Sequence, residues 1–120
     1  FVVVRGDTPT LDYHVDYGQV EIPAGVTGTM LTPLHAFNPP YGHLDYCDGG
    51  RELEYRYRVG DAILFDGKLE HRPQAAGSVE GEARVLVSWS IATEDPRYCF
   101  AIRRVIDSQM PDPPSPDAES

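Results

Sequence analysis

The sequence predicts an all-β domain built from short strands. Apolar segments recur about every ten residues, a spacing typical of a β-sandwich, jelly roll or barrel. The 120 residues include 11 glycines and 11 prolines, which separate these segments as turns. No segment combines a helical period with recognisable caps, so we expect no helix.

The first half of the chain contains five segments with the pattern of strands. Residues 1–4 are a run of β-formers, and residues 11–17 alternate between apolar and polar side chains. The next segment, residues 27–37, contains Pro33, which favours an edge strand or a bulge. Two further segments, 43–46 and 52–59, flank a glycine turn and predict a β-hairpin.

The second half of the chain continues the pattern. We expect strands over residues 62–65, 69–75 and 84–92, followed by an apolar segment over residues 98–106. Residues 1–107 are therefore expected to form one domain. The remaining residues, 108–120, are rich in proline, aspartate and serine, and we expect a disordered tail there.

The composition excludes some classes of protein. The net charge of −9 disfavours a nucleic-acid-binding protein, because such proteins need a basic face. No apolar run approaches 18 residues, so we expect no membrane span. Cys47 and Cys99 are too few for a disulfide framework, and whether they pair is left open. Neither compartment nor oligomeric state is indicated.

Three side chains predict a metal site. Two histidines and one carboxylate form the facial triad that holds Fe(II) and leaves positions open for other ligands. His14 and Asp16 are two residues apart and would lie on one face of a strand. His71 would share the face of Leu69, with its charged neighbours pointing the other way.

A second His-x-Asp pair, His43 and Asp45, competes for this role. The interval from His14 to His71 is 57 residues (14 to 71), room for about four strands. The interval from His43 is only 28 residues (43 to 71), room for about two. A double-stranded β-helix needs about four strands between the early ligand pair and the late histidine. We therefore expect His14 and Asp16 to be the early ligands, and His43 and Asp45 to be polar positions on a strand.

These segments resemble the 2-oxoglutarate- and Fe(II)-dependent dioxygenases, in the group with prolyl 4-hydroxylase-like domains. The resemblance covers roughly residues 1–92, and its last two blocks are the more specific. The matching blocks are residues 2–4, 13–17, 29–34, 60–72 and 84–90. The resemblance implies a double-stranded β-helix (jelly roll) that lacks the family's N-terminal helices.

The resemblance also implies a reaction and its residues. His14, Asp16 and His71 would bind Fe(II), and Arg84 would pair with the distal carboxylate of the cosubstrate 2-oxoglutarate. Hydroxylation of a small-molecule or peptidyl substrate would release succinate and CO2, with ascorbate as a candidate accessory. Many members carry Arg-x-Ser at this strand, whereas here Leu86 follows Arg84 and Ser88 comes next on the same face.

Other interpretations are compatible with the sequence. A cupin-type metal protein, either an isomerase, a cosubstrate-free dioxygenase or a small-ligand binder, would use similar ligands, and so would a binding module without activity. Pocket-lining and packing roles are both open for Tyr13, Thr32 and Tyr41. The face that carries Trp89 is apolar and needs a cover, so we expect the chain to be part of a longer protein or to bind a partner.

Overall fold

The structure, a computed structural model, describes residues 2–4, 11–18, 20–77 and 83–109. The tail expected over residues 108–120 lies outside this range from residue 110 onward. The elements of the described part are β1 (Val2–Val4), β2 (Thr27–Pro33), β3 (Leu44–Asp48), β4 (Arg51–Tyr55), β5 (Ile63–Asp66), β6 (His71–Pro73), β7 (Arg84–Ala92) and α1 (Cys99–Gln109).

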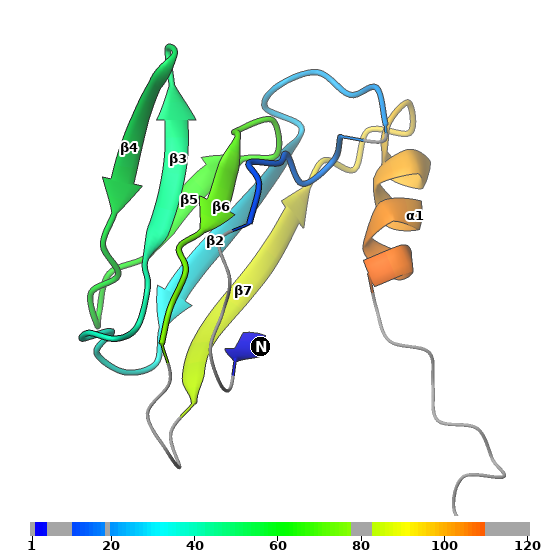
Figure 1. Ribbon diagram of the computed structural model, residues 1–120. Coiled ribbons are helices and arrows are strands. Elements are labelled where there is room, and N and C mark those ends of the chain that lie inside the picture. Colours follow the sequence, from blue (N-terminus) through cyan, green and yellow to red (C-terminus); the bar gives the residue numbers. More distant parts are fainter. Residues whose placement is uncertain (1, 5–10, 19, 78–82, 110–120) are drawn as a thin grey trace, which may run out of the picture.

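Two antiparallel sheets face each other across a common interior (Figure 1). The larger sheet has the strand order β1-β7-β2-β5, and the smaller sheet has the order β4-β3-β6. Strands far apart in the sequence are neighbours, since β7 lies between β1 and β2. The described part is therefore mostly β-structure, as expected, with one short helix.

Several strands form where the pattern predicted them. β7 matches the expected segment, and β3 and β4 form the expected hairpin with Asp48 opposite Arg51. Gly49 and Gly50 form its turn with φ of 57° and 80°, the left-handed values that such a tight turn requires. Pro33 was expected to lie on an edge strand or at a bulge, but β2 is an interior strand of the larger sheet. Beyond Leu31, β2 pairs with β7 alone, and proline is tolerated there.

The strand expected over residues 11–17 is not formed. Only His14 pairs, through an isolated antiparallel bridge to His71. Residues 16–18 form a turn that ends the extended segment. Alternation therefore placed His14 and Asp16 on one side, but it does not extend to Tyr17, which is buried and lines the same cavity as Asp16. The turn leaves too few residues for a ladder of hydrogen bonds.

The helix α1 was not expected from the sequence. The Asp95 carbonyl accepts hydrogen bonds from the N–H groups of Tyr98 and Cys99, and its carboxylate accepts one from the Arg97 N–H. An aspartate followed by proline is a recognised start signal for a helix, which the expectation of an apolar segment without a helix overlooked. The helix continues to Gln109, two residues past the expected end of the domain.

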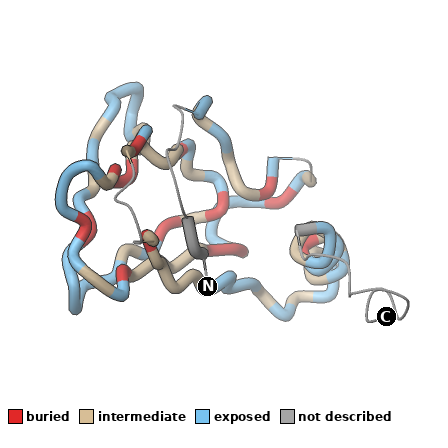
Figure 2. The backbone as a smooth tube through the Cα atoms, turned by 60° about the horizontal axis from the view of Figure 1, so that its bottom comes forward, coloured by how far each residue is buried: buried red, intermediate tan, exposed pale blue. Residues whose placement is uncertain are grey.

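Two hydrophobic clusters hold these elements together. The first lies between the sheets and is centred on buried Phe37, Leu44, Tyr57 and Phe65. The second attaches α1 to the segment before β2, through Tyr17, Ile22 and Ile102. In Figure 2 one buried stretch lies on the helix and the others lie mainly toward the interior. Both cysteines are free.

The outer face of the larger sheet carries exposed apolar side chains. Leu64 and Trp89 both pair with Met30, so the three form a row across β5, β2 and β7. Leu64 is 63% exposed and Trp89 44% exposed. The face for which we expected a cover is thus exposed to solvent at Leu64 and Trp89, and the existence of a cover stays a prediction.

Candidate metal centre

Backbone pairing brings the two histidines of the predicted site together. The His14 N–H donates to the His71 carbonyl, and the His71 N–H donates to the His14 carbonyl, both at 3.0 Å. Residues paired in this way point their side chains to the same face of a sheet. The two imidazole rings accordingly lie 4.5 Å apart between their centroids.

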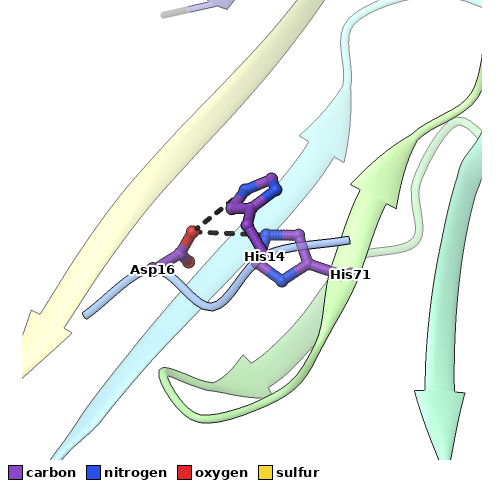
Figure 3. Close-up of side chains that lie close together, drawn as sticks. All are labelled: His14, Asp16 and His71. Atoms are coloured by element: carbon purple, nitrogen blue, oxygen red, sulfur yellow. Dashed lines mark ion pairs between the residues drawn. The ribbon is translucent and has the colours of Figure 1, made fainter. Parts of the chain in front are cut away.

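Asp16 completes the group from the same segment as His14. Its Oδ1 atom lies 3.2 Å from Nε2 of His71 and 3.8 Å from Nε2 of His14 (Figure 3). One ligand atom from each residue lies within 4.8 Å of the other two. The structure thus brings together the three residues predicted as ligands, and among the described residues they are the group with this geometry.

The hydrogen bonds of His71 suit a metal ligand. Its Nδ1 atom lies 2.9 Å from the Leu69 carbonyl oxygen, which accepts a hydrogen bond from an Nδ1–H group. In a neutral ring the proton on Nδ1 leaves a lone pair on Nε2, the atom that faces Asp16. A lone pair opposite a carboxylate needs a cation between them, either a proton or a metal ion. The donor set therefore fits a divalent cation.

Burial and charge shift the pKa values of this pair in opposite directions. Burial acts to raise the pKa of Asp16, but hydrogen bonds with His71 and Thr29 outweigh it, so that this pKa lies below its usual value. Burial acts to lower the pKa of His71, but the bonds to Asp16 and to the Leu69 carbonyl outweigh it, and this pKa is raised. The pair is therefore a carboxylate beside an imidazole that holds its proton firmly.

Access to the site comes from the side of His14. Its side chain is 49% exposed, whereas that of His71 is 8% exposed. The ring of Phe65 lies 4.7 Å from the ring of His71 and closes the inner side. An open and a closed side are what a site needs if it is to admit a substrate and still limit contact with water.

A cavity of about 190 Å³ adjoins two of the three residues, Asp16 and His71. Tyr17 and Ser90 both line it, and burial raises the pKa of the Tyr17 hydroxyl. Hydroxyl groups and two of the metal-site residues make this a mostly polar chamber. Its lining residues are Asp16, Tyr17, Thr29, Leu31, Phe65, His71, Ser88 and Ser90.

Arg84 lies further along the inner face of β7. It is only 7% exposed, and burial lowers its pKa while the neighbouring Tyr57 and Tyr41 act to raise it. Ser88 lines the cavity, but Arg84 is absent from its described lining. The two residues are four positions apart, about 13 Å along a strand. Leu86 lies between them and packs against the core.

The second His-x-Asp motif has a different arrangement. His43 is buried, and its Nδ1 atom accepts a hydrogen bond from the Tyr57 N–H at 2.8 Å. Asp45 pairs with Arg72 and accepts a hydrogen bond from the side chain of Gln74. The two residues thus serve different contacts, as expected for polar positions that do not share a metal.

Arg72 joins the ligand-bearing segments on the opposite face of the small sheet. Its guanidinium lies 4.3 Å from the centre of the Tyr13 ring and forms an ion pair with Asp45 at 3.3 Å. Its Nη1 atom also lies 3.5 Å from the Leu11 carbonyl oxygen. Tyr13 precedes one ligand and Arg72 follows another, so this cluster, the outer clasp, holds the two segments together from outside.

The sequence left both pocket-lining and packing roles open for three residues, and none of the three lines this cavity. Tyr13 belongs to the outer clasp, Thr32 donates a hydrogen bond to the Asp61 carbonyl, and Tyr41 packs against the core cluster. The sequence interpretation instead missed Tyr17 and Thr29. Alternation along residues 27–33 offered a signal for Thr29, since it shares a face with Leu31.

Comparisons with known proteins leave the site to be interpreted from its own geometry. A scan against models of protein families gives no match, and searches of curated proteins and of solved structures give no significant match. In the described ranges no helix is long and apolar enough to cross a membrane.

The outer clasp generates a first prediction. Replacing Arg72 with methionine is expected to lower the free energy of unfolding by about 1–2 kcal/mol, because a cation–π contact and a partly buried ion pair are lost. Metal affinity should fall as well, since the His14 segment is less firmly held. Urea denaturation and Mn(II) titration measure the two effects. Arg58→Met is the control, because Arg58 is exposed and its ion pair with Asp61 is long; equal effects of the two substitutions would contradict the role of the clasp.

The raised pKa of His71 generates a second prediction. Below this pKa the imidazole is protonated, and a metal ion must displace the proton to bind. The affinity for Mn(II) should therefore fall as the pH decreases through the pKa of His71 and level off above it. Calorimetry in buffers of different ionisation enthalpy measures the released proton. An affinity that does not change with pH across this range would contradict the prediction.

Proposed function

We propose that this protein is an Fe(II)- and 2-oxoglutarate-dependent dioxygenase that hydroxylates a small-molecule or peptidyl substrate. The observation that carries the proposal is the convergence of two imidazoles and one carboxylate within 4.8 Å. Two histidines and one carboxylate with further positions open are the ligand set of non-haem Fe(II) oxygenases. The resemblance in the sequence supports the same reaction.

The order of the strands supports a double-stranded β-helix as the fold of this enzyme. The His14 bridge extends the smaller sheet beyond β6, which gives each sheet four members among the described residues. A jelly roll consists of eight strands in two sheets. The proposed ligands would then come from two neighbouring members of the smaller sheet and project into the interior.

Each proposed residue has a distinct role. His14, Asp16 and His71 would hold Fe(II), which when bound supplies the activation of O2. Arg84 would orient 2-oxoglutarate, because a guanidinium forms paired hydrogen bonds with a carboxylate. One 2-oxoglutarate, one O2 and one substrate give succinate, CO2 and hydroxylated product, with one oxygen atom entering succinate and the other the product.

The position of the exposed histidine suggests where the substrate enters. The side chain of His14 is the accessible part of the site, while Phe65 covers the ring of His71. A substrate that approaches beside His14 would meet the metal directly, and the cosubstrate would occupy the interior toward Arg84. This arrangement keeps the two reactants on different sides of the metal.

The position of Arg84 also supports a second candidate function. Because Arg84 does not line the cavity beside the triad, a cupin-type metal protein that binds a small ligand in this cavity is the alternative. Such a protein would bind the metal without consuming 2-oxoglutarate. Conversion of 2-oxoglutarate to succinate therefore distinguishes the two functions.

The proposed function predicts a spectroscopic and a catalytic result. Anaerobic addition of 2-oxoglutarate to the Fe(II)-loaded chain should produce a visible charge-transfer band, and admission of O2 should yield succinate. Asp16→Asn should abolish both signals, while Asp48→Asn, the same change at an exposed aspartate of β3, should retain them. A wild-type chain that binds Fe(II) but gives neither band nor succinate would contradict the proposal.

A separate prediction concerns Arg84. Arg84→Gln should weaken the binding of 2-oxoglutarate at least about 30-fold, since removing one partner of a buried charge pair costs at least about 2 kcal/mol. Binding of Fe(II) alone should be unchanged. Arg84→Lys keeps the charge and should show a smaller loss. Titration of the charge-transfer band measures both variants; equal 2-oxoglutarate affinity in wild type and Arg84→Gln would exclude the role.

A further inference from the structure

The two oxygens of Asp16 have different partners. Oδ1 faces the histidines, at 3.2 Å from Nε2 of His71. Oδ2 accepts a hydrogen bond from the hydroxyl of Thr29 at 2.8 Å. The carboxylate is thus divided between one oxygen directed at the metal site and one oxygen held by the protein.

Thr29 is itself firmly placed. It lies in the middle of β2, with Phe65 opposite on β5 and Ser90 opposite on β7. Both neighbouring strands hydrogen-bond to β2 along this stretch, and a β-branched side chain has little freedom about its first torsion angle. The hydroxyl therefore occupies a well-defined position on the interior wall.

Asp16, by contrast, lies on a segment with little support of its own. Among the described residues, the strand-type backbone pairing of this segment is the bridge at His14, and residues 16–18 form a turn. A carboxylate on such a segment can rotate and bind a metal through one oxygen or through both. The hydrogen bond from the Thr29 hydroxyl opposes this rotation from the larger sheet.

We propose that Thr29 is a positioning residue that makes Asp16 a ligand through one oxygen only. With Oδ2 held by the Thr29 hydroxyl, Oδ1 alone is available to the metal, and a further coordination position stays open for other ligands. The inference rests on the metal site of the proposed function but does not depend on 2-oxoglutarate as cosubstrate. Contacts of this kind to ligating carboxylates typically change metal affinity 10–100-fold.

Substitutions of Thr29 test the inference in the full chain. Thr29→Val keeps the shape but removes the hydroxyl, and should weaken Co(II) binding about tenfold or more. Its Co(II) visible spectrum should also change, because a second carboxylate oxygen alters the coordination number. Thr29→Ser restores the hydroxyl and should restore both the affinity and the spectrum. Thr32→Val is the matched control on the same strand, since Thr32 bonds to the Asp61 carbonyl instead.

The outcomes separate this inference from the proposed function. An unchanged Co(II) spectrum in Thr29→Val overturns the inference, whatever the affinity, and so does a Thr29→Ser variant that behaves like Thr29→Val. If Thr29→Val does not fold, Thr29→Ala removes the hydroxyl without adding a group and takes its place. Co(II) binding that depends on Thr29, without turnover of 2-oxoglutarate, supports the inference and refutes the dioxygenase. A wild-type chain that binds no metal overturns both.

Discussion

The reciprocal pair of backbone hydrogen bonds between His14 and His71 is the constraint on which the candidate site depends. It joins a segment that has no strand of its own to β6, across 57 residues of sequence (14 to 71). The pairing also determines that both imidazoles point to the same side of the sheet. Asp16 reaches the same point only because it follows His14 by two residues, so all three positions depend on this one bridge.

Both faces of the smaller sheet contribute to the site. The inner face presents the imidazoles to the interior, while the outer face holds the same two segments through Tyr13, Arg72 and Asp45. Asp45 of the second His-x-Asp motif belongs to this support, while His43 accepts a hydrogen bond from the Tyr57 N–H. Alternation explains the division, since neighbours along a strand face opposite sides and a ligand pointing inward has a fastening residue next to it pointing outward.

The polar and charged groups in the interior lower the stability that a domain of this size can gain from its core. Charged and polar groups such as His71, Asp16 and Arg84 occupy space that apolar side chains would otherwise fill, and buried ion pairs contribute little to stability. The raised pKa of His71 and the lowered pKa of Asp16 are consistent with a site where a metal ion takes the place of a proton.

The sequence by itself determined the class of fold and the identity of the three converging residues, because alternation and spacing are local properties of the chain. It also identified β7 and the glycine hairpin, where turn chemistry is explicit. It did not reveal α1, because the segment over residues 98–106 was recognised as apolar but not as helical. Only the tertiary structure decided that Thr29 contacts Asp16 and that Arg72 fastens the His14 segment. These contacts join residues that are distant in the sequence, and their geometry depends on how the two sheets pack.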